Sequence, residues 1–146
     1  MTEDIGRNRI IVGVDGSTPS IDALRRGAQI AGALEFPLEA ITTWDYPVTF
    51  ESYYPTDVPP EVDAAKILAE AVEQAFGGNS PKGLTQTVLH GPPARVLIEQ
   101  SRGAFMLVLG SRGQGGFVGL LLGSVSFACA SHAHCPVLVM RTSEPA

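Results

Sequence analysis

Apolar residues follow two patterns along the chain, and the two patterns alternate. Five short runs, either continuously apolar or alternating apolar with polar, predict β-strands at residues 9–15, 37–44, 84–90, 105–110 and 135–141. The first and fourth runs contain almost no polar residue, which is typical of strands buried on both faces of a parallel sheet. Between these runs the apolar positions recur at the spacing of amphipathic helices.

The first predicted helix has a clear start and one apolar face. Ser17 or Thr18 can cap it, and Pro19 lies in its first turn. Gly27 and Gly32 are expected to allow close packing against the sheet. The predicted apolar face comprises Ile21, Leu24, Ala28, Ala31 and Leu34.

Three further helices are predicted later in the chain. One begins at two adjacent prolines and places Val96 and Leu97 in the core, and the last is capped by Ser124. Residues 45–60, with four prolines and no steady period, predict an irregular loop. The helix after this loop spans residues 61–76, with an apolar face made of Val62, Ala65, Leu68, Ala69, Val72 and Phe76.

Strands that alternate with helices throughout predict a doubly wound α/β fold. Such a chain makes right-handed crossovers and covers a parallel sheet on both faces. A length of 146 residues suits one domain, residues 1–146, and 45% hydrophobic residues suffice for a packed core.

Charge and composition exclude several classes of protein. Ten basic and fifteen acidic residues give a net charge of −5, which argues against a nucleic-acid partner. The uncharged run of sixteen residues from 115 to 130 is too short and too rich in glycine to span a membrane. The N-terminal residues do not resemble a signal peptide, and the two cysteines suggest reduced, buried thiols. We therefore expect a cytoplasmic protein without a membrane partner.

The glycine-rich segment 110–126, GSRGQGGFVGLLLGSVS, follows the fourth predicted strand directly. Ligands of open α/β sheets bind at the carboxyl ends of the strands, where Asp15 and this segment both lie. Backbone amides around its glycines, and those that open the next helix, can approach a phosphate closely. A glycine-rich turn without a ligand stays open at this point.

Better-known site motifs do not fit this sequence. The P-loop requires a lysine that the segment lacks, and Val118 stands where the dinucleotide fingerprint requires glycine. The nucleophile elbow G-x-S-x-G is absent. Cysteines and histidines in CASHAHC, residues 129–135, lack the paired spacing of a zinc site. No catalytic residue and no metal ligand is therefore assigned.

The spacing of the glycines in this segment resembles a motif of a known protein family. Gly110 and Gly113, then nine residues, then Gly123 and Ser124 match the G-2x-G-9x-G-[S/T] motif of ATP-binding universal stress proteins. IIVGVDGS at the first strand, Gly91-x-Pro93-Ala94 and the terminal SHAHCPVLVMR extend the similarity over nearly the whole chain. The sequence resembles an actinobacterial-type member with a single domain.

This resemblance implies a three-layer sandwich with a five-stranded parallel sheet of order 3-2-1-4-5. It also implies ATP, with Mg²⁺ or Mn²⁺, bound across the ends of strands 1 and 4. Asp15 and Gly13 would meet the adenosine end, and Thr43 is a further candidate for an adenine contact. The ribose and phosphates would be held by Gly110, Ser111, Arg112, Gly113, Gln114, Gly115, Gly116, Gly123, Ser124 and Val125.

Two positions depart from the family pattern. Phe105 stands where an acidic residue is frequent, and Gln114 stands where a basic residue or histidine is frequent. The loss of a basic group at 114 is expected to weaken phosphate affinity, for which Arg112 can compensate.

The function implied by the resemblance is that of a nucleotide-dependent regulator in the stress response. A nucleotide-free dimeric interaction module and a slow ATPase remain as alternatives. Members of the family dimerise through the last strand, so a homodimer through Cys135–Arg141 is also expected.

Overall fold

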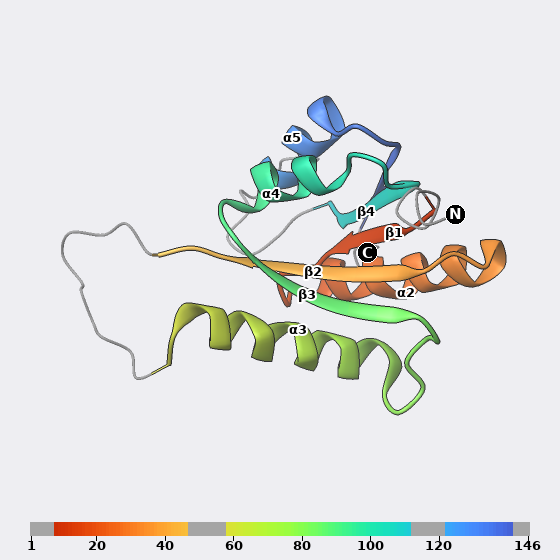
Figure 1. The fold of residues 1–146 in the computed structure, drawn as a ribbon, viewed down its shortest axis with the longest axis horizontal. Coiled ribbons are helices and arrows are strands. Elements are labelled where there is room, and N and C mark those ends of the chain that lie inside the picture. The colour runs from red at the N-terminus through yellow and green to blue at the C-terminus, as the bar shows by residue number, and fades with distance from the viewer. Residues whose placement is uncertain (1–7, 47–57, 112–121, 142–146) are drawn as a thin grey trace, which may run out of the picture.

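One parallel sheet of five strands forms the centre of the protein, whose computed structural model describes residues 8–46, 58–111 and 122–141. Strand order is β3-β2-β1-β4-β5, as the resemblance implied, and every neighbouring pair is parallel (Figure 1). The strands are β1 (Ile10–Gly13), β2 (Leu38–Trp44), β3 (Leu84–His90), β4 (Met106–Gly110) and β5 (Val137–Met140).

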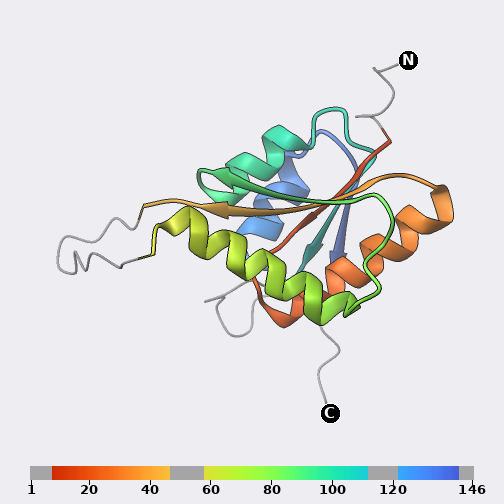
Figure 2. The same ribbon diagram turned by 60° about the horizontal axis from the view of Figure 1, so that its bottom comes forward.

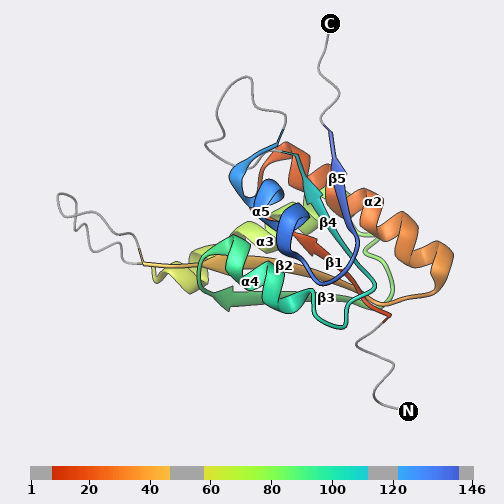
Figure 3. The same cartoon turned by 90° about the horizontal axis from the view of Figure 1, so that it is seen from above.

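Helices cover both faces of the sheet and confirm the predicted α/β class. They are α2 (Thr18–Leu34), α3 (Pro60–Phe76), α4 (Pro93–Gln100) and α5 (Ser124–His132). Figures 1 and 2 show α2 and α3 on one face and α4 and α5 on the other. Seen from above, α4 lies over the β2 side of the sheet and α5 nearer to β5 (Figure 3). None of the helices in the described ranges is long and apolar enough to cross a membrane.

The central strands β1 and β4 are buried on both faces, which explains their uninterrupted apolar sequences. Ile10 and Val12 pack in the core beneath α2 and α3, whereas Ile11 packs in the core beneath α4 and α5. These three side chains and Leu107 have no exposed surface. Each such burial stabilises the fold by roughly 1.5–3 kcal/mol.

The N-terminal part of α2 agrees with the prediction from the sequence, but the C-terminal part does not. Ser17 caps the helix and accepts a hydrogen bond from the Ser20 amide at 3.4 Å. Gly27 lies against β1, since an added Cβ would approach Val12 Cγ2 to 2.6 Å. At Gly32 the prediction of close packing is wrong, because nothing lies within 4 Å of that position. Likewise Leu34, the last helical residue, is 42% exposed where burial was predicted.

In α3 the buried face is rotated from the predicted one. Leu68 and Val72 are buried as expected, but Ala65 and Ala69 are exposed and Val62 is 53% exposed. Ala64 and Ala71 pack in the core in their place. Alanines surround this helix on several sides, so apolar spacing alone could not select the face that contacts β2 and α2.

The first residue of α5 also differs from the prediction. Gly123, with φ −73° and ψ 170°, is the N-cap, and Ser124 is already helical. No side chain therefore caps this helix. The expected cap at Ser124 is wrong by one residue, because the chain leaves the extended conformation at the glycine.

The cysteines are free thiols in different surroundings. Cys129 of α5 is completely buried, and Cys135 is half-buried before β5. Burial, with a smaller contribution from Cys135, raises the pKa of Cys129 to about 11. Such a thiol is uncharged at neutral pH and behaves as a small apolar core residue.

An ion-pair network links the chain segments at the amino edge of the sheet. The Arg9 guanidinium donates to Glu39 Oε1 at 2.7 Å and to the Gln100 carbonyl at 2.8 Å. Glu39 Oε2 accepts a further bond from the Thr87 hydroxyl at 2.7 Å. The network thus joins the residue before β1 to β2, β3 and the end of α4.

Candidate functional site

A cavity of about 740 Å³ lies at the carboxyl ends of the strands, where the sequence predicted a ligand site. Its volume falls within the range usual for sites that take small molecules and cofactors. Residues from the ends of β1, β2 and β4, from the turns that follow them and from all four helices line it. The wall contains Gly13, Val14, Asp15, Ser17, Ser20, Ile41, Thr42, Thr43, Trp44, Asp45, Ile67, Gly91, Pro93, Leu97, Leu109, Gly110, Leu122, Gly123, Ser124, Val125, Ser126 and Phe127.

The turn between β1 and α2 fixes one side of the cavity. Asp15 Oδ1 accepts hydrogen bonds from the Ser17 amide at 2.9 Å and from the Ser17 hydroxyl at 2.5 Å. Gly16 has a φ of 86°, and an added Cβ would lie 3.1 Å from Ile67 Cγ2 of α3. A glycine is required here because the turn needs a positive φ and lies directly against α3.

Two glycines in the wall lie in close contact with neighbouring residues. An added Cβ at Gly110 would lie 2.6 Å from Pro19 Cβ and 2.8 Å from the Pro19 carbonyl carbon. At Gly13 it would lie 2.7 Å from a methyl group of Leu109. The absence of a side chain at Gly110 therefore allows the end of β4 to contact the first turn of α2.

The N-terminus of α5 offers unpaired donors to the cavity. The first turns of α2, α3 and α4 each contain proline, which has no amide hydrogen, whereas α5 begins Ser124-Val125-Ser126. Gly123 provides no capping side chain, and within the described residues no acceptor pairs with these three amides. Free amides at a helix N-terminus favour an anionic group.

Hydrogen bonds join the end of β4 to the start of α5 and to β5. The Ser111 carbonyl accepts from the Gly123 amide at 2.6 Å, and the Ser111 amide donates to the Met140 carbonyl at 2.7 Å. The Ser126 hydroxyl donates to the Gly110 carbonyl at 2.5 Å. These bonds hold the end of β4 beside the start of α5 and beside β5.

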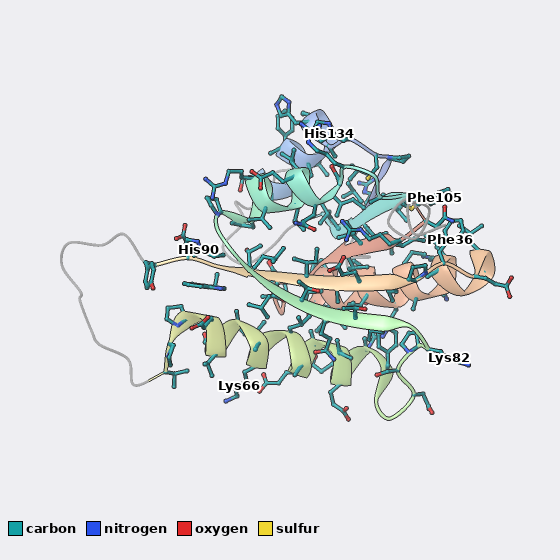
Figure 4. All side chains as sticks on the ribbon, viewed as in Figure 1. Phe36, Lys66, Lys82, His90, Phe105 and His134 are labelled. Carbon is teal, nitrogen blue, oxygen red and sulfur yellow. The ribbon has the colours of Figure 1, made fainter. Side chains whose placement is uncertain are left out.

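Three aromatic rings cluster at the end of β2, and one of them, Trp44, lines the cavity. Trp44 lies 4.4 Å from the His90 ring and 5.4 Å from the Tyr46 ring, measured between ring centroids. His90 Nε2 lies 3.4 Å from Asp45 Oδ1. Figure 4 shows His90 at this edge of the sheet, while Phe36 and Phe105 lie together at the opposite edge.

Charge in the described part of the wall is negative. Asp15 and Asp45 are the charged residues there, and no lysine or arginine of the described ranges joins them. Over the same ranges, no group of three or more His, Cys, Asp or Glu side chains could hold a metal ion. Within the described residues, a phosphorylated ligand would therefore depend on helix amides and on cations that it brings with it. Arg112, which the resemblance assigns to the phosphates, lies outside the described residues.

The structure brings most of the describable predicted residues together. Gly13, Asp15, Thr43, Gly110, Gly123, Ser124 and Val125 all line the cavity. Ser111 is buried beside it, and residues 112–116 lie outside the described residues. Sequence reasoning missed other residues of the cavity wall, notably Ile41, Thr42, Trp44, Ile67, Leu97, Leu109 and Phe127.

Comparison with known proteins identifies the family. The model of the universal stress protein family matches residues 6–141. The chain belongs to the universal stress protein family. Universal stress protein Rv2623 of Mycobacterium tuberculosis is 34% identical over 135 residues, which are 92% of this chain and 45% of that protein. This universal stress protein thus spans about half the length of the curated relatives it matches.

Solved structures share the fold of this universal stress protein. A universal stress protein in complex with cAMP is 28% identical, with a TM-score of 0.71 over 93% of this chain and 98% of that one. A universal stress protein from Archaeoglobus fulgidus in complex with dAMP is 20% identical, with a TM-score of 0.63 over 90% and 96% of the chains. The second likeness shows the fold alone.

Proposed function

We propose that this universal stress protein binds an adenine nucleotide, expected to be ATP with Mg²⁺ or Mn²⁺, and acts in the cytoplasm as a nucleotide-dependent regulator of the stress response. The observation that carries the proposal is the start of α5. Its first three amides have no partner among the described residues and belong to residues that line a cavity large enough for a small ligand.

Three further observations support an adenine nucleotide in this cavity. Its interior is mainly apolar, with Ile41, Leu97 and Leu109 in the wall, which suits the base. Asp15 at the end of β1 supplies a carboxylate for the polar atoms of a nucleoside. The 28% identical universal stress protein that was solved with cAMP holds an adenine nucleotide.

The proposal can be tested by identifying any nucleotide that copurifies with the protein. The freshly purified protein is denatured, and the released compounds are identified by chromatography. We expect an adenine nucleotide at nearly one per chain from the wild type and less than about a tenth of that from Gly123→Val. The valine side chain is expected to crowd the anion site at the first amides of α5.

Gly32→Ala is the matched control, because Gly32 lies in open space on α2. It should retain the nucleotide, and circular dichroism should show that both variants are folded. The proposal is wrong if the wild type releases no nucleotide and its melting temperature does not respond to Mg·ATP, AMP or cAMP.

We also propose that two copies associate through the β5 edge, residues 135–141. In the described part of the chain β5 pairs only with β4, and its four apolar residues are only half-buried. Exposed apolar edge strands favour pairing with another chain. Light scattering at micromolar concentration should give the mass of a dimer, and the mass of a monomer would refute this proposal.

A further inference from the structure

The two edge strands of the sheet differ in length and in composition. β5 has four residues and follows Pro136, whereas β3 has seven and pairs with β2 along its whole length without a bulge. In the described part of the chain β3 ends the sheet on its other side (Figure 3). Edge strands are usually protected by shortness, lysine, proline or bulges. β3 has none of these features, and His90 is its one ionisable side chain.

The backbone of β3 offers hydrogen bonds on its outer side. The Gly91 amide donates to the Trp44 carbonyl at 2.8 Å, so Gly91 and every second residue before it turn their backbone groups toward β2. The amides of Gln86, Val88 and His90 therefore point outward. Among the described residues, no backbone acceptor outside the sheet pairs with these three amides.

The helix that covers β3 has an exposed apolar side. Val62 of α3 is 53% exposed, and Ala65 and Ala69, about one and two turns further along, are also exposed. Helix propensity explains alanine on the surface of a helix. It does not explain a half-exposed valine, because β-branched residues are poorer helix formers.

This exposed side of α3 faces the β3 edge. The Gln74 carbonyl accepts a hydrogen bond from Arg25 of α2 at 3.0 Å, and Ile67 lies against the turn before α2. At about 100° per residue, Ala65 and Ala69 lie roughly 140–180° around the helix from Gln74 and Ile67. Since α3 packs against α2, β2 and β3, the side turned away from α2 is the side at the sheet edge.

We propose that the outer edge of β3 and the exposed side of α3 form a self-association surface, on which a second copy of this chain pairs its own β3. Identical strands that hydrogen-bond about a twofold axis run antiparallel, so the two sheets become one continuous sheet. The surface lies at the opposite edge from β5 and is independent of bound nucleotide.

Backbone direction and side-chain chemistry agree with this pairing. The register that joins all seven residues places Thr87 opposite the Thr87 of the second copy, and Gln86 opposite Val88. Gln86 and Val88 both turn their backbone groups outward, so each such pair exchanges two hydrogen bonds. His90 lies opposite Leu84, and no like charges meet across the strands.

Strand spacing brings the two α3 helices within packing distance. Neighbouring strands lie about 4.8 Å apart, so a helix centred between β2 and β3 lies roughly 5 Å from a twofold axis outside β3. The two helix axes are then roughly 10 Å apart, which is close to the distance at which helices pack. Val62, Ala65 and Ala69 of each copy become covered. A lone extended peptide would pair with β3 but leave this side of α3 bare, which favours a second copy.

Sedimentation velocity on the full chain tests the surface. A small contact is expected to be weak, so the range runs from about 1 µM to about 500 µM. The wild-type mass should rise at least about twofold above its value at the lowest concentration. Gln86→Pro should keep its low-concentration mass throughout, because proline removes an outward amide and is tolerated on edge strands. Gln86→Thr keeps the amide and should associate as the wild type does.

A second pair of variants tests the helix without changing the strand. Ala65→Glu brings two carboxylates between the paired helices and should weaken the association at least about tenfold. Gln74→Glu is the matched control, because it adds the same charge on the α2 side of α3 and also has a glutamate four residues before it. It should associate as the wild type does. Circular dichroism should show that all four variants are folded.

Deuterium exchange locates the contact on the chain. In the wild type, exchange of residues 84–90 should slow at high concentration, and in Gln86→Pro it should not. The inference is overturned if the wild-type mass is constant over this range, if Gln86→Pro or Ala65→Glu associates as the wild type does, or if a control variant loses the association. Growth in mass with slower exchange at residues 135–141 alone would assign the contact to β5 and also overturn it.

Discussion

Gly110→Ala is expected to lower the free energy of unfolding by about 3 kcal/mol, the upper end of what overpacking usually costs. The added methyl group would lie 2.6 Å from Pro19 Cβ and 2.8 Å from the Pro19 backbone carbon. Backbone atoms of a helix cannot turn aside as a flexible side chain can. The end of β4 and the start of α2 must therefore separate, which also widens the cavity between them. Urea unfolding followed by circular dichroism measures the change.

Gly32→Ala serves as the control for this substitution. Gly32 lies inside α2 with nothing within 4 Å, so alanine gains helix propensity without a clash. An increase in stability of about 0.5–1 kcal/mol is expected. If Gly110→Ala were as stable as the wild type while Gly32→Ala behaved as expected, the close contact between β4 and α2 would be wrong.

Arg9→Met should destabilise the protein by about 2–3 kcal/mol, because it leaves the carboxylate of Glu39 without its cation. The side chains of Arg9 and Glu39 are 24% and 15% exposed, so water only partly compensates for the loss. The guanidinium also holds the carbonyl of Gln100 at the end of α4. Thermal unfolding at neutral pH measures the effect.

The double variant Arg9→Met with Glu39→Gln separates charge from packing. Removal of the stranded carboxylate should recover a part of the lost stability, and comparison of the double variant with both single variants, Arg9→Met and Glu39→Gln, gives the coupling energy of the pair. Arg9→Lys keeps the charge but not the forked donors, so an intermediate loss is expected. Equal stability of all these variants and the wild type would show that this network contributes nothing.

Much of the fold could be predicted because its local signals agree with one another. The apolar runs at β1 and β4 indicate burial on both faces, and Ser17 followed by Pro19 marks the start of α2. The buried face of α3 could not be predicted, since alanines on several sides satisfy more than one helical spacing. Only tertiary contact with β2 and α2 selects Ala64 and Ala71.

The site was predicted where a motif is local in sequence and missed where the wall is built from distant residues. Gly123, Ser124 and Asp15 could be predicted as site residues because they lie at the ends of predicted strands and helices. Ile67 could not be found, since it reaches the cavity only because α3 packs against β2 and against the turn at Gly16. Trp44 did carry a usable signal, because it ends a strand at the edge where ligands bind.

Glycines show a further limit of sequence reasoning. Gly13 and Gly110 were predicted from their resemblance to ligand-binding positions, and both do line the cavity. The structure adds a second reason for each, a close contact with Leu109 and with Pro19. Phe105, which departs from the family pattern, packs against Phe36 with 4.9 Å between ring centroids. Its place at the amino edge explains why an apolar residue is accommodated there.

The hydrogen bond between Ser111 and Gly123 joins the residue after β4 directly to the N-cap of α5. The residues on either side of residues 112–122 are held together at 2.6 Å, and both flanks are fastened to the sheet and to α5. Because these anchors are hydrogen-bonded to each other and to β5 and α5, the positions of β4, β5 and α5 are coupled at the carboxyl ends of the strands. A displacement of α5 is therefore expected to shift the ends of β4 and β5 with it.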